Sequence, residues 1–277
     1  MNEPTALPGE VARPDTKRRG RRFTGRGFWV VQLLTYAGLL ATWELLARAG
    51  AIDTFFFPEP SRIGGALWRL TASGDIFAEA SITFLEMAVG LVIGSVAGIG
   101  LGLALVRMPL AWRLVQPLVY FAYSLPRIAL APLFIVALGL GIASKIATVV
   151  FTVFFVLLIN TVAGAESVSH DYVRSARALG ATEGQVTRKV IIPGTLAWIF
   201  SGLRLAVSLA FLSAVVAEFV GATGGLGYRL QLAAVYFNTV EIFAWLFVLG
   251  FFAALINVAV TAVERRLLAW RPKTYGM

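Results

Sequence analysis

Long apolar segments recur along this chain of 277 residues, and they limit the fold classes that the chain can adopt. Residues 28–49 and 81–106 each hold enough apolar side chains to cross a bilayer, which takes about 20 residues in a helix. The mean hydropathy of +0.79 and the 58% share of hydrophobic residues agree with a membrane protein. Because a backbone in lipid has to satisfy its own hydrogen bonds, these segments are expected to be helices.

Four more apolar segments bring the expected number of spans to six, in an all-α, polytopic integral membrane bundle. They cover residues 115–138, 145–165, 196–220 and 242–263. Pro126 and Pro132 interrupt the third span, and since proline removes a backbone donor, this helix is predicted to be kinked or broken at both places. In the second span, glycines recur at every fourth position over residues 90–102, which predicts close packing against another helix.

The spans divide the chain into four parts. Residues 1–27 form a basic, proline-rich tail that is predicted to be disordered, and residues 28–78 hold the first span and a short interfacial helix capped by Ser61. Residues 79–263 form the main transmembrane domain, and residues 264–277 form a basic C-terminal tail. A polar loop at 166–194 interrupts the main domain between the fourth and fifth spans.

Basic residues are distributed unevenly between the two sides of the membrane. With six spans both termini lie on one side, and that side also holds the polar loop and most of the Lys and Arg residues. The positive-inside rule therefore places both termini and the loop in the cytoplasm. The net charge of +9 follows from this topology, so no nucleic-acid partner is expected. The chain has no cysteine, which excludes disulfides and thiolate chemistry.

The polar loop has a helical pattern of its own. Ser169 or Asp171 can cap a first short helix, and Gly180 suits the end of that helix. Thr182 and Gln185 have the spacing of a capping box, which predicts a second short helix. Two short helices joined at a glycine corner would project from the membrane as a small knob. The Gly-rich stretch at 221–227 is expected to be a flexible loop on the opposite side.

One stretch of the polar loop has a characteristic spacing: Arg174-Ser175-Ala176, three residues, Gly180, nine residues, and Val190-Ile191-Ile192-Pro193. It resembles the Glu-Ala-Ala, three residues, Gly, nine residues, Ile-x-Leu-Pro signature of permeases in bacterial binding-protein-dependent ABC importers. Arg174 and Ser175 depart from the Glu and Ala of that signature. Residues 126–132, 202–205 and 217–221 resemble the branch that imports nitrate, aliphatic sulfonates, taurine or thiamine-precursor pyrimidines.

This resemblance implies a type I ABC importer permease fold and a permease subunit that forms the translocation path for a small solute. The implied partners in the bacterial inner membrane are a cytoplasmic ABC ATPase dimer, a second copy of the permease, an external solute-binding protein and membrane lipid. In the family, the polar loop docks on the ATPase and couples its closure to the spans. The residues implied at this contact are Tyr172, Val173, Arg174, Ser175, Ala176, Arg177, Leu179, Gly180 and Pro193.

The chain has no nucleotide-binding motif. A Gly-x-x-x-x-Gly-Lys-Ser/Thr stretch does not occur in it, so ATP and Mg²⁺ are expected in the partner ATPase, and no cofactor is expected here. We expect neither an enzyme nor a metal site, because the spans show no paired carboxylates, His/Glu metal set or nucleophile–base pair. A stand-alone secondary transporter is the alternative function, although it would leave the polar loop unexplained.

Six residues within the spans are candidates for the translocation path or for intramembrane polar contacts. They are Glu86, Pro126, Arg127, Asn160, Arg204 and Glu218. An isolated charge in a bilayer is costly, so Arg127 and Arg204 either attract an anionic solute or anchor helices by pairing with acidic residues. Glu86 and Glu218 are available as acidic partners for the second role. Asn160 is expected to make a hydrogen bond that supports helix packing.

Overall fold

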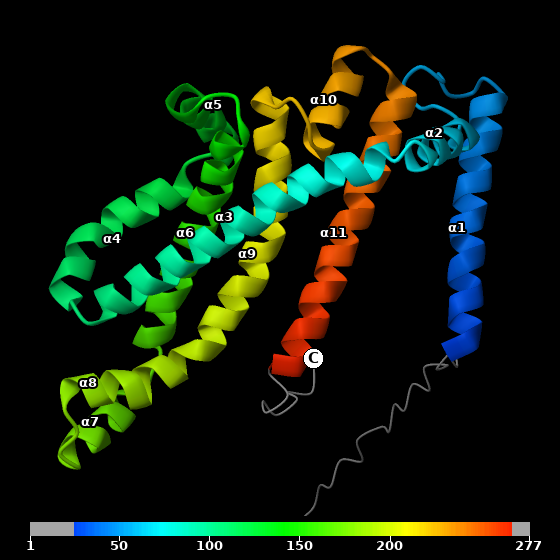
Figure 1. Cartoon of the computed structure of the whole chain (residues 1–277). Helices are drawn as coiled ribbons and strands as arrows, with labels where there is room; N and C mark the ends of the chain where they lie inside the picture. The colour runs from blue at the N-terminus through cyan, green and yellow to red at the C-terminus, as the bar shows by residue number, and fades with distance from the viewer. Residues whose placement is uncertain (1–24, 268–277) are drawn as a thin grey trace, which may run out of the picture.

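The computed structural model describes residues 25–267, and every regular element in that range is helical (Figure 1). In chain order the elements are α1 Gly25–Arg48, α2 Pro60–Ala72, α3 Asp75–Val106, α4 Pro109–Ser124, α5 Arg127–Leu138, α6 Ile142–Glu166, α7 His170–Ala178, α8 Glu183–Val186, the π-helix η1 Thr187–Ile191, α9 Ile192–Gly221, α10 Leu226–Val235 and α11 Thr239–Leu267. The prediction of an all-α fold is confirmed for this part of the chain.

The prediction of six spans is also confirmed. Five helices are each long and apolar enough to cross a membrane, and a bent pair of helices makes the sixth span. The five cover Phe28–Arg48, Asp75–Val106, Ile142–Glu166, Glu183–Gly221 and Thr239–Glu264. The bent pair, α4 and α5, occupies the place of the predicted third span.

The bent span changes direction by 99° between Pro109–Ser124 and Ile128–Leu138. Leu125 and Pro126 have extended backbone between the two helices, because proline disfavours the helical conformation in the residue before it and donates no hydrogen bond. The break predicted at Pro126 is therefore confirmed. At Pro132, where a kink or a break was predicted, the helix is not broken: this proline lies inside α5 without ending it.

The glycine ridge of α3 packs against α6 in the centre of the bundle, where α9 completes the core. A Cβ atom on Gly90 would stand 2.5 Å from Cβ of Val149, and one on Gly98 would stand 2.5 Å from the carbonyl oxygen of Phe154. Ordinary contacts of a Cβ atom begin at 3.4 Å, so only glycine permits this approach. The close packing predicted along residues 90–102 is confirmed.

Helix α1 lies at the edge of the bundle and is joined to it through its last turns (Figure 1). Ala47 is buried, and the ring of Trp43 packs on that of Phe243 with their centroids 5.8 Å apart. Glu44 accepts a hydrogen bond from the backbone N–H of Ser61 at 2.9 Å, which connects α1 to α2. Most of α1 is therefore exposed, as expected of a helix that faces lipid.

Helix α2 occupies the place of the expected interfacial helix. It begins at Pro60, and its N-cap is Glu59 rather than Ser61, because the fixed φ of proline suits the first helical position. Ile63 and Ala66 are buried against α11. The segment is therefore anchored to the bundle at this end.

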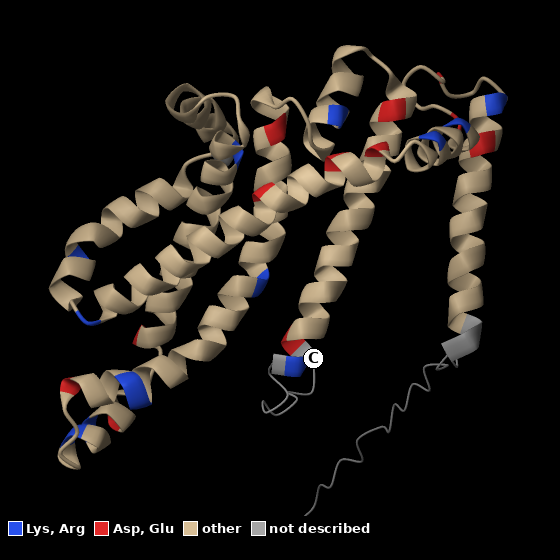
Figure 2. Cartoon of the chain, in the orientation of Figure 1, with Lys and Arg blue, Asp and Glu red and all other residues tan. Residues whose placement is uncertain are grey.

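The bundle has two ends with different contents. The beginning of α1, the end of α11, α7 and α8 lie at one end, called here the α7 end, and α2, α5 and α10 lie at the other, called the α10 end (Figure 1). Figure 2 shows the charged residues gathered toward these two ends, with few along the helices between them. Both ends of the described chain lie together, as an even number of spans requires.

Candidate functional site

The first helix of the polar loop is α7. Ser169 caps it, since its Oγ accepts the backbone N–H of Asp171 at 3.3 Å, so Ser169 is the capping residue of the two candidates. Gly180 follows the helix with a φ of +84°, which L side chains rarely adopt. Its N–H donates to the carbonyl of Arg177 at 2.9 Å, and the next N–H donates to that of Ala176 at 3.1 Å. This is a Schellman end, and it turns the chain sharply.

The second helix, α8, is fixed to α7 by a charged pair. The predicted capping box is confirmed: Gln185 Oε1 accepts the N–H of Thr182 at 2.9 Å, and Thr182 Oγ1 accepts the N–H of Gln185 at 3.4 Å. Arg177 donates two hydrogen bonds to the carboxylate of Glu183, at 2.8 and 3.0 Å. These bonds raise the pKa of the Arg177 guanidinium further, so the link stays charged. Residues 169–186 therefore form a compact unit, called here the knob.

The knob presents apolar side chains to its surroundings. Leu179 is 88% exposed and Tyr172 is 69% exposed, although both side chains are apolar or aromatic. Arg174 is also exposed and lies 3.5 Å from Asp171, whereas Ala176 is partly covered. Gly180 makes the sharp turn without strain, and it leaves Leu179 on the outside of the knob.

Pro193 lies inside a helix that continues from the knob into the membrane. α8, η1 and α9 form one unbroken span, Glu183–Gly221. The N–H of Ile192 donates to the carbonyl of Thr187, five residues earlier, so the helix widens into a π turn just before the proline. The wider turn accommodates a residue that has no N–H of its own. The expected separation between the second short helix and the fifth span is therefore wrong.

A cavity of about 370 Å³ lies where the knob meets the bundle. Its walls include Trp112 from α4, Glu166 at the end of α6, and His170 and Val173 from α7. Trp112 is buried and donates from Nε1 to Glu166 Oε1 at 3.1 Å. This bond joins α4 to the end of α6, just before the chain enters the knob.

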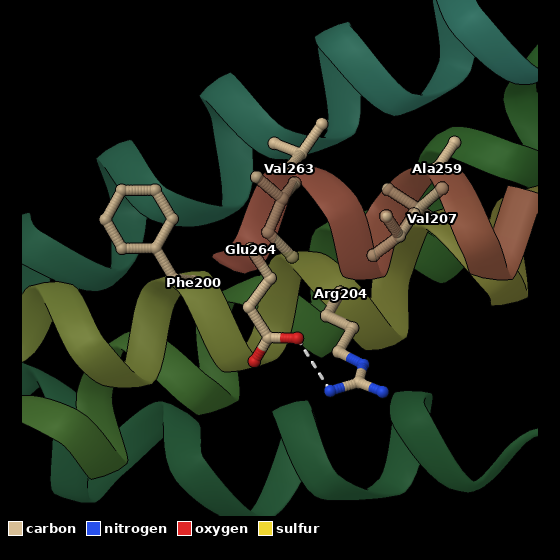
Figure 3. Close-up of a pocket in the computed structure, with 8 residues that line it drawn as sticks. Phe200, Arg204, Val207, Ala259, Val263 and Glu264 are labelled. Carbon is tan, nitrogen blue, oxygen red and sulfur yellow. Dashed lines mark hydrogen bonds and ion pairs between the residues drawn. The ribbon is translucent and has the colours of Figure 1, made fainter. Parts of the chain in front are cut away.

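Arg204 forms an ion pair on the face between α9 and α11. Its Nη1 lies 2.7 Å from Oε2 of Glu264, and both side chains are partly exposed (Figure 3). The pair lines an apolar groove of about 230 Å³. The groove is also lined by Phe200, Leu203, Val207, Ala259, Val260 and Val263. Arg204 therefore pairs with Glu264 across α9 and α11, and not with Glu86 or Glu218.

The other predicted intramembrane residues lie apart from this pair. Pro126 is the N-cap of α5 and Arg127 is its first residue, at the bend of the broken span. Asn160 donates to the carbonyl of Val156 at 2.8 Å, and its side chain packs against Gly202, where a Cβ would stand 2.8 Å from Cβ of Asn160. The expected packing role of Asn160 is consistent with this contact between α6 and α9.

Glu218 belongs to a buried polar cluster at the α10 end. Its Oε1 accepts from Oγ1 of Thr83 at 2.7 Å, and its Oε2 accepts the N–H of Gly227 at 2.6 Å. Glu79 accepts the N–H of Gly225 at 2.6 Å, and Thr83 accepts the N–H of Leu226 at 2.9 Å. The unpaired N–H groups at the start of α10 are thus satisfied by side chains of α3 and α9, two of them carboxylates that suit a helix N-terminus.

This arrangement corrects the prediction of a flexible Gly-rich loop. Gly225, Leu226 and Gly227 are buried, and the turn at 222–225 is bound on two sides. Gly225 has a φ of +107° and approaches the Glu218 carboxyl closely, so it leaves no room for a side chain.

Lys145 and Arg229 supply the positive charges of the cluster. Lys145 is 2% exposed, and its Nζ donates to the carbonyl oxygens of Leu140, Gly141 and Gly221. Lys145 on α6 therefore binds the turn between α5 and α6 and the end of α9, whereas the sequence suggested a lysine at the outer edge of a span. Arg229 donates to Glu79 at 2.6 Å, and this bond raises the pKa of the Arg229 guanidinium.

Part of this cluster could be recognised from the sequence. Glu79, Thr83 and Glu86 lie at intervals of four and three, which places them on one face of a helix. No such pattern connects α3 with Lys145 or with the turn after Glu218. Among residues 25–267, no three His, Cys, Asp or Glu side chains come together as a metal site would require.

Comparison with known proteins gives a consistent result. The family model for the binding-protein-dependent transport system inner membrane component matches residues 90–270. A formylaminopyrimidine transport permease protein from Halalkalibacterium halodurans is 33% identical, over 87% of this chain and 95% of its own length. A taurine transport system permease protein from Escherichia coli is 29% identical, over 85% of this chain and 88% of its own length.

Solved structures share the fold. A methionine ABC transporter in an inward-facing conformation has a TM-score of 0.60 and 22% identity, and the match covers 69% of this chain and 95% of the other. An amino acid ABC transporter has a TM-score of 0.59 and 16% identity, with 72% and 97% covered. The region that the family model matches, residues 90–270, includes the knob.

Proposed function

The chain belongs to the family of binding-protein-dependent transport system inner membrane components. We propose that a separate cytoplasmic ATPase binds the knob and drives transport through this contact. As a member of this family the chain is the transmembrane permease subunit of an ABC importer, and not a stand-alone secondary transporter. The observation that carries the proposal is that an exposed apolar side chain of the knob, Leu179, is held in a fixed position. Leu179 is 88% exposed, yet the Schellman end and the Arg177–Glu183 pair hold it in place.

The proposed orientation follows from the distribution of charge. The α7 end carries the knob, both ends of the described chain and most of the basic residues, so we place it in the cytoplasm of a bacterial inner-membrane protein. The α10 end then faces the external solute-binding protein. A second copy of the permease would complete the translocation path, as in an importer with two permease subunits, and ATP and Mg²⁺ would bind to the ATPase.

The proposed solute is a small sulfonate or a heterocyclic compound. The similar permease proteins are described as transporting taurine and formylaminopyrimidine. Arg127, at the bend of the broken span, and Arg204 are the residues that we propose for attracting an anionic group, with Pro126 shaping the bend. Arg204 keeps part of its guanidinium accessible while it pairs with Glu264, so an anion can approach it.

The test is ATP-driven uptake by the permease reconstituted with its ATPase and binding protein. Leu179→Asp places a charge on the exposed apolar surface, and Gly180→Leu forces a side chain into a backbone conformation that strains it. Losing one central apolar anchor weakens a protein interface by about 2 kcal/mol, or roughly 30-fold. We expect both variants to insert normally but to lose copurification with the ATPase and most of their uptake.

The matched control is Gly184→Ala, in the second helix of the same knob. No described residue of another element lies within 4 Å of a Cβ placed there, and its backbone is helical. This variant should copurify and transport like the wild type. If Leu179→Asp and Gly180→Leu also behave like the wild type, the ATPase does not bind at the knob.

A further inference from the structure

A small cavity at the α10 end contains a buried carboxyl oxygen without a donor. The cavity measures about 130 Å³ and lies between α3, α6 and the turn at 222–225. Glu86 and Lys145 line it, and Leu140 and Thr223, both exposed, lie at its mouth. Glu86 is only 2% exposed, and its Oε2 has no hydrogen-bond partner among the described residues. A buried acceptor without a donor is costly, so this oxygen indicates that the cavity takes up a ligand.

The neighbouring donors are already engaged elsewhere. An ammonium group has three N–H donors, and those of Lys145 are directed at three carbonyl oxygens. Arg229 donates to Glu79 and lies 3.8 Å from Asp75. Thr83 donates to Glu218. None of these bonds of Lys145, Arg229 and Thr83 reaches Glu86.

The acids in the cluster also outnumber its bases. The groups that face one another here are Asp75, Glu79 and Glu86 on α3, Lys145 on α6, Glu218 on α9, and Tyr228 and Arg229 on α10. Asp75 is partly exposed and is not counted here. The remaining acids are three buried carboxyl groups, and the bases that can balance them are one ammonium group (Lys145) and one guanidinium group (Arg229). One buried negative charge remains without compensation, and a single proton would neutralise it.

Glu86 and Glu218 differ in the way that decides which of them carries a proton. Thr83, which donates to Glu218, stands three residues before Glu86 on α3, so the Glu218 carboxyl group lies against the face of α3 that carries Glu86. Both oxygens of Glu218 already accept hydrogen bonds, from Thr83 and Gly227. A carboxyl group that accepts two hydrogen bonds is stabilised in its ionised form. Glu86 accepts none at Oε2.

We propose that the cavity is a proton-binding site, in which Glu86 takes one proton from the water at the α10 end and donates it to Glu218. The bond formed is the O–H of Glu86, and the proton comes from solvent through the mouth of the cavity beside Thr223. Glu218 then keeps its bonds to Thr83 and to the start of α10. When the proton leaves, two adjacent carboxylates repel each other, and the bonds that hold the turn at 222–225 are weakened.

The proposal concerns the permease alone and does not depend on the ATPase or the solute. It is tested by thermal unfolding of the purified full chain in detergent, at constant ionic strength, from about pH 5 to about 9, a window wide enough for buried carboxyl groups. We expect the wild-type Tm to fall by about 4 °C or more as the pH rises. Glu86→Gln, which keeps a donor at this position, should have a Tm that changes much less with pH.

Two further variants make the comparison specific. Glu241→Gln removes an acid from the first turn of α11, outside the cluster, and should follow the wild-type profile. Glu218→Gln should be destabilised at every pH, because its amide nitrogen would replace an oxygen that accepts a hydrogen bond. If the Tm of Glu86→Gln changes with pH as the wild-type Tm does, the proposal is overturned. It is also overturned if Glu86→Gln lowers the Tm at every pH while Glu218→Gln leaves it unchanged.

Infrared spectroscopy of the wild-type protein gives a readout that requires no folded variant. A protonated, buried carboxyl group has a C=O stretch that ionised carboxylates lack, and we expect this band to disappear as the pH is raised across the same window. If no such band is present at the low-pH end, the proposal is wrong. If sodium chloride, compared with choline chloride at fixed pH, raises the Tm of the wild type but not of Glu86→Gln, the ligand is a sodium ion and the proposal is overturned.

Discussion

Replacing Gly98 by alanine measures how strongly the core depends on the glycine ridge. A Cβ on Gly98 would stand 2.5 Å from the carbonyl oxygen of Phe154 and 3.2 Å from the backbone nitrogen of Leu158. Ordinary contact begins at 3.4 Å, so α3 and α6 would have to separate by several tenths of an ångström or more. The obstacle is the main chain of α6, which cannot rotate aside as a side chain can. This separation would loosen the fully buried Leu157 and Leu158.

The expected cost is that of overpacking a close-packed core, about 1–3 kcal/mol. For a chain of this size, that corresponds to a Tm lowered by roughly 3–10 °C. The assay is thermal unfolding of the detergent-purified permease, followed by tryptophan fluorescence and by the monodisperse fraction in size-exclusion chromatography. Uptake should fall in parallel with the amount of folded protein.

The matched control is Gly100→Ala, two residues further along the same helix. Gly100 is exposed, and no described residue of another helix lies within 4 Å of a Cβ placed there. Alanine is favoured over glycine in a helix interior by roughly 0.5–1 kcal/mol, so this variant should be as stable as the wild type or more stable. If Gly98→Ala and Gly100→Ala have the same Tm, the ridge does not set the distance between α3 and α6.

Two further predictions concern the charged pairs. Arg204→Glu should lower the Tm by a few degrees, since two carboxylates would face each other between α9 and α11, and the double variant Arg204→Glu/Glu264→Arg should restore it. Recovery of uptake in the double variant would show a purely anchoring role, whereas recovered stability without uptake would show that the solute needs a cation at position 204. Arg177→Gln and Glu183→Gln should each reduce ATP-driven uptake, and the double variant should be no worse than either one, because both remove the same link between α7 and α8. Additive losses of uptake would contradict a shared role.

The features that local sequence patterns determine were predictable. A run of apolar residues indicates a span, a glycine at every fourth position marks a close helix contact, and Thr182 with Gln185 marks a helix start. Each of these depends on residues that are neighbours along one helix. The break at Pro126 was predictable for the same reason. Pro132 was not a break, because the surrounding helix tolerates one missing hydrogen bond.

The contacts that depend on how helices converge could not be predicted. Lys145 ends an apolar segment, which a hydropathy pattern reads as a membrane boundary, yet the carbonyl oxygens of residues 140, 141 and 221 meet around it. Glu264 was assigned to the C-terminal tail, but the crossing of α9 and α11 brings it to Arg204. Glu86 and Glu218, the acids that the sequence offered as partners, lie instead at the α10 end, where Glu218 binds Thr83 and Gly227.

One helix connects the two polar regions. The span Glu183–Gly221 has 39 residues and runs from the knob to the polar cluster, a length of about 58 Å for a straight helix. Glu183 at its start is bound to Arg177, and Glu218 near its end is bound to the start of α10. If this helix moves as a rigid body, a movement of the knob also displaces the residues that hold the turn at 222–225. The π turn before Pro193 is the point on this path where the helix is least regular, so it is the place where such a movement can be absorbed as bending.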